Sequence, residues 1–571
     1  MFSHPLPPTS DGFADASWDD IVRYYRDLAA VPLDAATLEP WLAAWSRLEE
    51  LVTEAASLAM IAYTNDTTDA AKQAAHLRFS TDILPKLGEC EVALAKRFVT
   101  IGTDRDDLQT VLKRFRTAIE IFREANVPLT AEAEQLAATY QQRTGTMSAT
   151  WGGEQVPLPR LAPFLKSGDR AVREAAWRAS VAPYVAARDE LATLFDRMVT
   201  LRQQMARNAG FADYREFVFA AKCRFDYTPA DCERLHEAIA ATVVPALGRA
   251  MEARRERLGL DVLRPWDTQV DPWREHAPVP YREPAELPAI AARIFAAVDP
   301  HLGGEFRLMM QEGLLDLESR PGKAPGGYCD TLHARGRPYV FMNAAGVPED
   351  VTVLLHEAGH CFHAFASHAR PFIWQRHPGA ESAELASMSM ELLAAPHLER
   401  PVGYYGEADA VSARLEHLED VLVSLAHIAS VDAFQSWIYT DPTGGEAAAR
   451  DRQWLALRER FEVGVAWDGL EAERVARWYR QLHIFLYPFY YIEYAIAQIG
   501  ALQVWRNARR DPAGAVAAYR RFLALGATRP LPELYAEAGV SFSFDAGLLG
   551  ELVALIEAEM AELRGVLARA A

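Results

Sequence analysis

Apolar residues that recur at three- and four-residue spacing dominate the first half of this chain. From residue 18 to about residue 260 the period repeats in one segment after another, with few runs of β-branched residues. Long helices are predicted over residues 38–63, 70–101 and 171–206, the last rich in Ala, Leu, Arg and Glu. The apolar positions keep no strict heptad, which favours packing within a helical body over coiled-coil pairing. The expected fold is mainly α.

Two stretches interrupt this period. Between residues 259 and 288, several prolines predict a connector and the clearest boundary in the chain: Pro265, Pro272, Pro278, Pro280 and Pro284. A helical piece is expected over 289–318. After a Gly/Pro-rich stretch at 321–327, residues 327–332 and 338–343 flank a polar turn and predict a β-hairpin, a small antiparallel element.

Helices dominate again from residue 348 onward. They are predicted over 348–368, 381–395, 408–439 and 483–505, and no internal repeat is found. We expect an N-terminal helical lobe over about residues 1–200 and a second region over 201–571 that interleaves with it. A chain of 571 residues is long enough to bury more than one core and to contain a deep cleft.

Charge and cysteine content exclude several classes of protein. A formal net charge of −19 repels phosphate backbones, and without a basic cluster no nucleic-acid partner is expected. Five cysteines, odd in number and not in CxxC spacing, indicate neither a disulfide framework nor a thiolate zinc site and fit a reducing cytoplasm. No signal peptide and no stretch of membrane-spanning length are expected, so no membrane association is predicted.

The segment His356-Glu357-Ala358-Gly359-His360 carries the strongest chemical signal. Pro348-Glu349-Asp350 opens its helix, and apolar residues carry the helix into a core. His356 and His360, at i and i+4, share one helix face and can bind one metal ion, whereas Glu357 is displaced from them and can act as a general base on water. Chance would produce such a motif in only about 0.03 chains of this composition, so a zinc site is favoured.

A third protein ligand is expected from the helix at 381–395. Glu384 is flanked by apolar and small residues, a costly position for a carboxylate unless it is paired or bound to metal. Glu391, two turns later on the same face, can accept the second ring N–H of a metal-binding histidine. Glu381 and, to a lesser extent, His363 remain rival ligands, and His363 is also a candidate neighbour of the ligands.

Two further groups are candidates for contacts with a substrate. His483 stands close to a run of tyrosines, of which Tyr490 and Tyr491 come first and Tyr494 and Tyr487 second as donors to a developing oxyanion. Dense aromatic packing in a core is the competing interpretation. In the hairpin, an exposed edge at residues 339–343, including Tyr339, can pair with an extended peptide, and Gly326 and Gly327 permit loop movement. A purely structural hairpin fits these residues equally well.

These residues together resemble the thimet oligopeptidase and oligoendopeptidase F family of zinc metallopeptidases, most closely its oligoendopeptidase F-like branch. The resemblance rests on residues 356–363, similar to HExGHxxH, on the segment from Glu384 to Glu391, with Glu384 28 residues after His356, and on the His/Tyr segment from 483 to 494. Softer similarity includes residues 223–229, 327–329 and 434–439. The likeness covers roughly residues 130 to 550.

The resemblance implies a two-lobed helical fold with a deep central channel that admits short unfolded peptides. It also implies one zinc ion held by His356, His360 and Glu384, with Glu357 as the catalytic base. The resulting hypothesis is an endopeptidase that acts on short peptides. A carboxypeptidase or dipeptidyl carboxypeptidase and a non-catalytic peptide-binding scaffold are the alternatives, and cobalt or manganese can replace zinc in such a site. The sequence indicates no oligomeric state.

Overall fold

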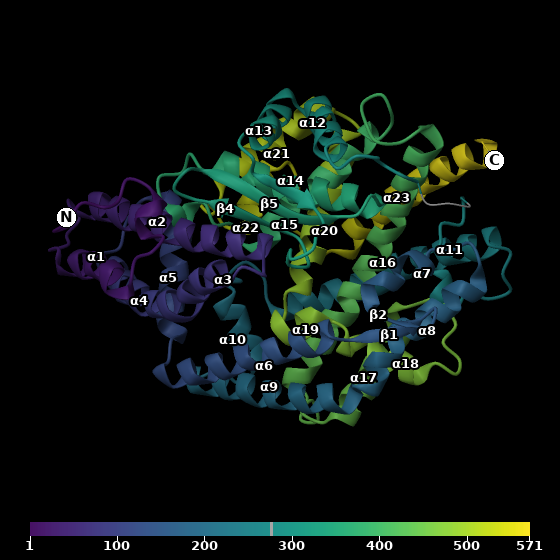
Figure 1. Cartoon of the computed structure of the whole chain (residues 1–571), viewed down its shortest axis with the longest axis horizontal. Coiled ribbons are helices and arrows are strands. Elements are labelled where there is room, and N and C mark those ends of the chain that lie inside the picture. Colours follow the sequence, from purple (N-terminus) through teal and green to yellow (C-terminus); the bar gives the residue numbers. More distant parts are fainter. Residues whose placement is uncertain (275–277, 571) are drawn as a thin grey trace. The chain divides into compact units, whose positions relative to one another are not determined.

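The computed structural model describes residues 1–274 and 278–570. In this part of the chain the fold is mainly α, as predicted, and contains two small sheets (Figure 1). Contacts divide the chain into two compact units. The first contains Met1–Glu120, Val279–Glu407 and Gly500–Phe542, and the second contains Ile121–Pro278, Ala408–Ile499 and Ser543–Ala571. Each unit is assembled from three segments, so residues 1–200 contribute to both.

The first unit contains the strands β3 to β5 and most of the helices of the N-terminal part. Its helices are α1 Trp18–Ala30, α2 Leu38–Asn65, α3 Ala70–Leu77, α4 Leu84–Ile101, α5 Gln109–Ile121, α12 Glu286–Val298, α13 Pro300–Gln311, α14 Pro348–Ser367, α15 Ala380–Ala394, α21 Pro512–Leu525 and α22 Leu531–Glu537. A core forms around α2, where Trp41, Trp45 and Leu48 are fully buried at helical spacing.

The second unit is built almost entirely from helices. They are α6 Val127–Gly145, α7 Ala162–Leu165, α8 Arg170–Ala186, α9 Arg188–Ala209, α10 Tyr214–Ala221, α11 Pro229–Arg257, α16 Glu407–Thr440, α17 Ala447–Phe461, α18 Glu471–Tyr479, α19 Leu482–Leu486 and α23 Ala546–Ala570. The helix α20 Tyr491–Ala508 begins in this unit and ends in the first. A short hairpin that the sequence did not predict, β1 Ser148–Trp151 and β2 Glu154–Pro157, packs against α8.

The sheet of the first unit contains the predicted hairpin and one strand more. Strand β4 Tyr328–Leu332 pairs antiparallel with β5 Arg337–Ala344, and β3 Leu315–Glu318 pairs with β5 in parallel. The strand order β3-β5-β4 puts β5 in the centre. The prediction of a free edge at residues 339–343 is therefore wrong, because β5 has a hydrogen-bonded neighbour on each side. Within the described chain, the edge strands of this sheet are β3 and β4.

Three predicted helices are shorter than expected. Residues 171–206 form α8 and α9, which are separated at Ala187, four residues after Pro183 in α8. The piece at 289–318 contains α12, α13 and the strand β3. Asp299 caps α13 through the N–H groups of His301 and Leu302, and β3 owes its conformation to pairing with β5.

The third is the expected His/Tyr helix at 483–505, which is interrupted. The short helix α19 ends at Leu486, and α20 begins at Tyr491. Between them lies Pro488, followed by Phe489 with a φ of 61°. A residue with a side chain rarely adopts this left-handed conformation, so a regular helix cannot pass through the position.

The connector predicted at 259–288 has one short 3-10 helix, Pro265–Asp267, before α12 begins; residues 275–277 of it lie outside the described residues. One unit boundary, between Pro278 and Val279, falls in this stretch. The expectation that no segment reaches membrane-spanning length needs a correction. Helix α16 is long and apolar enough, with a mean hydropathy of 1.3 over 18 residues, but 67% of that window is buried, as in a core helix of a globular protein.

Candidate metal centre and aromatic segment

The start of helix α14 is joined to the residues before it by the carboxylate of Asp350. The carboxylate Oδ2 of Asp350 accepts hydrogen bonds from the backbone N–H groups of Ala345, Gly346 and Val347 at 2.8 to 2.9 Å, and from the Tyr281 hydroxyl at 2.5 Å. A carboxylate in the first turn is stabilised by the helix dipole, and here it also satisfies the N–H groups of the three residues before the helix. The local sequence thus fixes where α14 begins and which residues face the neighbouring helix two turns later.

Glycine 359, between the two histidines of the motif, allows α14 and α15 to pack closely. A Cβ atom at this position would lie 2.5 Å from the Cα of Ser387 and 2.7 Å from the carbonyl oxygen of Ala386, both on α15. No side chain fits in that space without moving the helix backbones. The close approach brings the carboxylate of Glu384 to the face of α14 that carries His356 and His360.

Three predicted ligands meet at this contact. The Nε2 of His356 lies 3.3 Å from Oε2 of Glu384, and the Nε2 of His360 lies 3.9 Å from the same oxygen. The three ligand atoms are all within 4.8 Å of one another. Ligands at ~2.0–2.2 Å from a tetrahedral zinc ion are about 3.3 Å apart, so two imidazoles and one carboxylate at these distances fit the ion with little movement.

Two glutamates tune and orient the histidines. Burial alone would lower the pKa of His356, but hydrogen bonding and attraction from Glu384 and Glu391 outweigh it and raise that pKa well above its usual value. The pKa of His360 falls to about 4, mainly through burial. The carboxylates that favour a proton on His356 also create the negative potential that attracts a divalent cation.

Glu357 does not belong to the group of ligand atoms, but the charges of that group act on its carboxylate. Burial raises the pKa of Glu357 to about 7; His356 opposes this rise, and Glu384 and Glu391 reinforce it. A carboxylate with a pKa close to neutral can both accept and return a proton at physiological pH. This is the property that a general base in hydrolysis needs.

The rival ligands lie elsewhere in the first unit. Neither Glu381 nor His363 belongs to the group of ligand atoms around Glu384 in the described chain. His363 is 4% exposed, its ring lies 5.5 Å from that of Phe522, and neither ring nitrogen has a hydrogen-bond partner among the described residues. The structure therefore brings Glu384, and not these two residues, to the histidines.

His483 and its tyrosines belong to the second unit and form a compact aromatic cluster there. The ring of His483 lies 5.0 Å from that of Tyr491, 5.7 Å from Tyr490, 5.9 Å from Tyr487 and 6.2 Å from Tyr494. Tyr487 is 54% exposed, whereas burial raises the pKa of Tyr491 to about 12. Four phenols around one imidazole can supply several hydrogen-bond donors to a bound ligand.

Buried arginines that sequence reasoning missed hold this segment in place. The guanidinium of Arg224 donates to the carbonyl of Phe489 and, at 2.7 Å, to Glu493, and Gln435 accepts from the N–H of Phe489 at 2.8 Å. Arg202 donates to the carbonyls of Ile484 and Phe485. The only sequence signal for Arg224 was its place in the segment 223–229 that resembles the family.

The hairpin residues lie in the first unit with mainly structural contacts. The hydroxyl of Tyr339 accepts a hydrogen bond from Asn65 at 2.9 Å, and its side chain is buried. Gly326 has a φ of 99°, which favours glycine, and a Cβ at Gly327 would lie 3.3 Å from the carbonyl oxygen of Phe341. Binding of substrate by these three residues stays a prediction.

Comparison with known proteins finds similarity to peptidases over much of the chain. The sequence model of peptidase family M3 matches residues 164–553. An oligoendopeptidase F homologue of Borreliella burgdorferi is 26% identical over 252 residues, 41% of this chain and 40% of that protein. Oligopeptidase PepF of Bacillus subtilis is 22% identical over 393 residues, 66% of this chain and 55% of that protein. The matches thus span about half the length of these curated relatives or less.

Solved structures are similar over nearly the whole chain. PZ peptidase A, crystallised with an inhibitor, superposes with a TM-score of 0.86 at 25% identity, covering 98% of both chains. An oligoendopeptidase F described as putative superposes with a TM-score of 0.85 at 27% identity and the same coverage. The similarity extends beyond the motif helices to the architecture of the whole chain.

Proposed function

Because the chain belongs to peptidase family M3, we propose that it is a zinc-dependent metallopeptidase that hydrolyses internal bonds of short oligopeptides. The observation that carries this proposal is the convergence of His356, His360 and Glu384 on one small volume, with ligand atoms within 4.8 Å of one another. Glu357 lies on the same helix and is not needed as a ligand. A purely structural zinc site has no use for such a base, which argues against a non-catalytic scaffold.

In the proposed mechanism His356, His360 and Glu384 would hold a zinc ion. The ion would supply Lewis acidity, which increases the acidity of water and polarises the carbonyl of the scissile bond. Glu357 takes the proton from the attacking water and later returns it to the leaving amine, for which its pKa of about 7 is suited. Glu391 holds the ring of His356 in the orientation that leaves Nε2 for the ion, through the contact at Nδ1.

We assign stabilisation of the oxyanion to the aromatic cluster of the second unit. His483, Tyr490 and Tyr491 are the first donors proposed, with Tyr494 and Tyr487 next. Support comes from the ring distances of 5.0 to 6.2 Å around His483 and from the buttressing of this segment by Arg224 and Arg202. Donors that are fixed before the reaction stabilise developing charge without reorganisation.

The proposed compartment is a reducing cytoplasm. All five cysteines are free thiols, including Cys329 and Cys361, whose Sγ atoms lie 3.6 Å apart. The location is supported by the cysteine pattern itself, which is odd in number and lacks CxxC spacing.

The variant Glu357→Gln tests the proposed activity. It should keep its zinc content and lose about 10²–10⁴-fold in turnover of peptides, because the proton acceptor is gone while the ligands remain. Glu349→Gln, an exposed glutamate in the first turn of the same helix, is the matched control and should hydrolyse peptides like the parent. Parent-like hydrolysis by Glu357→Gln would show that the mechanism is wrong. Peptides blocked at the C-terminus separate the alternatives, since a carboxypeptidase would leave them uncut.

A further inference from the structure

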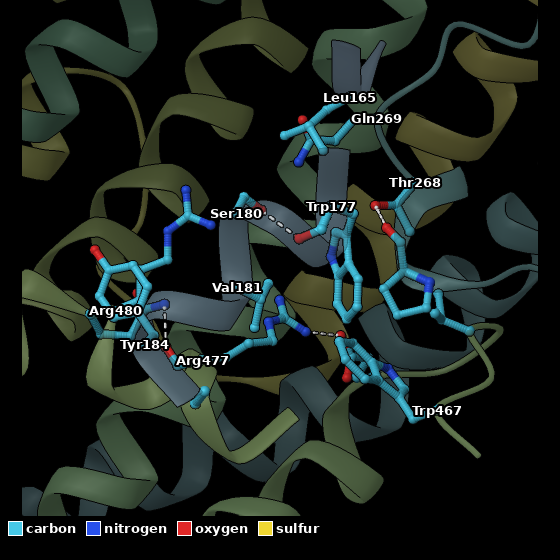
Figure 2. Close-up of a pocket in the computed structure, with 15 residues that line it drawn as sticks. Leu165, Trp177, Ser180, Val181, Tyr184, Thr268, Gln269, Trp467, Arg477 and Arg480 are labelled. Atoms are coloured by element: carbon cyan, nitrogen blue, oxygen red, sulfur yellow. Dashed lines mark hydrogen bonds and ion pairs between the residues drawn. The ribbon is translucent and has the colours of Figure 1, made fainter. Parts of the chain in front are cut away.

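The second unit contains a pocket that the proposed mechanism does not use. It lies between α8, the loop that joins α17 to α18, and α18 itself, and encloses about 280 Å³. Binding pockets for small molecules usually enclose roughly 300–1,000 Å³, so this one suits a ligand of one or two amino-acid residues. In Figure 2, Trp177 and Trp467 lie on one side of the view, Tyr184 and Arg480 on the other, and Val181 and Arg477 between them.

One wall of the pocket is aromatic and apolar. The rings of Trp177 and Trp467 are 5.9 Å apart, and Leu165, Val181 and Ala476 complete this wall. These residues belong to the small core cluster of the second unit, so the wall is held by packing from behind. Indole faces and aliphatic side chains favour an apolar group, and a phenylalanine side chain is of suitable size for this space.

The other side of the pocket carries an excess of positive charge. The single carboxylate of Glu462 pairs with Arg477 at 2.5 Å, Arg458 at 2.7 Å and Arg474 at 3.2 Å. Three guanidinium groups around one carboxylate leave two positive charges uncompensated at that point. Burial and repulsion from Arg477 lower the pKa of Arg458 to about 10, although Glu462 opposes the shift. In a chain of net charge −19, this concentration of arginines is a local exception.

Two hydrogen-bond donors of the lining lack an acceptor. Arg480 is exposed and makes neither a hydrogen bond nor an ion pair within residues 1–274 and 278–570. Trp467 is only 8% exposed, and its indole N–H has no partner in the same part of the chain. A buried N–H without an acceptor lowers stability, and an oxygen atom of a ligand can restore the missing hydrogen bond. Free donors and excess positive charge both favour a carboxylate.

The pocket is connected to the aromatic cluster of the same unit. Gln481 lines the pocket, and its Oε1 accepts a hydrogen bond from the hydroxyl of Tyr491 at 3.0 Å. Tyr491 in turn lies against His483. The side chain of Gln481 therefore links a ligand in the pocket to Tyr491, to which we assign a contact with substrate.

We propose that this pocket binds the C-terminal residue of a peptide, with an aromatic or large aliphatic side chain against Trp177 and Trp467 and the terminal carboxylate at Arg480. The proposal rests on the proposed function for its choice of peptides as ligands. It assigns this unit a preference for peptides that end in an apolar residue with a free carboxylate. Recognition combines burial of the side chain with a charge-assisted hydrogen bond.

Calorimetric titration of the zinc-loaded protein with N-acetyl-L-phenylalanine and with its C-terminal amide tests the proposal. The acid should bind at least about tenfold more tightly than the amide, and Arg480→Gln should remove most of that difference. Arg307→Gln, which removes an exposed arginine of α13 in the first unit, changes net charge equally and should bind like the parent. Equal binding of acid and amide, or no effect of Arg480→Gln, would overturn the proposal.

Two further measurements test whether the acid binds at another site or for another reason. The acid should still bind after the metal is chelated; binding that disappears with the metal belongs to the metal centre and rules the pocket out. Inorganic phosphate should compete poorly, because it lacks the apolar group, and competition as strong as that of the acid would contradict the role of the tryptophans. These are binding readouts, so a failure of the proposed catalysis, seen as absent hydrolysis, is distinguishable from a failure of this pocket.

Discussion

The Nδ1 of His356 lies 2.7 Å from the Oε1 of Glu391, two turns beyond Glu384 on the same helix. With Nδ1 engaged by a carboxylate, the ring leaves Nε2 directed at Glu384, at 3.3 Å. One helix, α15, thus supplies both the proposed carboxylate ligand and the group that orients a histidine ligand. We therefore expect metal affinity to depend on the contact between α14 and α15.

The first prediction concerns Glu391. Replacing it with alanine should weaken zinc binding about 10–100-fold, because His356 loses the partner that fixes its ring and increases its basicity. Glu391→Gln, which retains an oxygen acceptor, should have a smaller effect. Competition with a chelator of known affinity measures both values, with the exposed Glu89→Ala on α4 as control. Unchanged zinc affinity in Glu391→Ala would remove the orienting role from this contact.

The second prediction concerns the close packing at Gly359. Gly359→Ala should destabilise the protein by about 1–3 kcal/mol and reduce zinc affinity, because the new Cβ would lie 2.5 Å from Ser387 and push α15 away. Gly304→Ala on α13 is the matched control, since a Cβ there meets no atom within 4 Å. The control should gain about 0.5–1 kcal/mol from helix propensity. Urea unfolding and chelator competition measure the two effects, and a stable, zinc-binding Gly359→Ala would refute the argument.

Local features of this site could be predicted from the sequence, and features set by packing could not. The i, i+4 spacing of His356 and His360 is a property of one helix, so it predicted their shared face directly. The choice among Glu384, Glu381 and His363 depends on how α15 lies on α14, and that depends on the space left by Gly359. The sequence contained this glycine but gave no measure of how closely the helices approach.

The same reasoning explains where the fold predicted from the sequence was wrong. Residues 487–490 continue the aromatic pattern of a helix, yet hydrogen bonds from Arg224 and to Gln435 hold Phe489 in the left-handed region. Strand β3 has only four residues and forms because it pairs with β5, a contact with no local signal. In each of these cases tertiary contacts override the local preference.

The third prediction concerns the pair Arg224 and Glu493. Arg224→Met should cost about 3–5 kcal/mol in stability, because it removes the buried guanidinium that lies 2.7 Å from the buried carboxylate of Glu493. The double variant Arg224→Met/Glu493→Gln should recover part of this loss, since the buried carboxylate is then removed together with its arginine. The single variant Arg224→Met and the double variant should both raise KM for peptides. In each, the carbonyl of Phe489 loses the hydrogen bond from Arg224, and the tyrosine segment loses that support.

Urea unfolding of the two single variants and the double variant gives the coupling energy of this pair. Additive single effects would mean that Arg224 and Glu493 act independently, against the structure. A loss of stability without any change in KM would mean that the pair supports the fold but not the segment around Tyr490 and Tyr491.

The last prediction concerns pH and the buried His363. Burial lowers the pKa of His363 to about 3 in the folded protein, whereas an unfolded histidine has a pKa of about 6.5. Between these values the unfolded chain binds a proton that the folded chain does not, so folding stability is lost as the pH falls. The loss is about 1.4 kcal/mol per pH unit, or about 2 kcal/mol between pH 6.5 and pH 5.

His363→Phe removes the ionisable group but keeps a ring beside Phe522. Urea unfolding of parent and variant at pH 7.5 and 5.0 should therefore show a smaller acid-induced loss in the variant by about 2 kcal/mol. Equal losses in the two proteins would mean that His363 is protonated in the fold and its burial is incomplete.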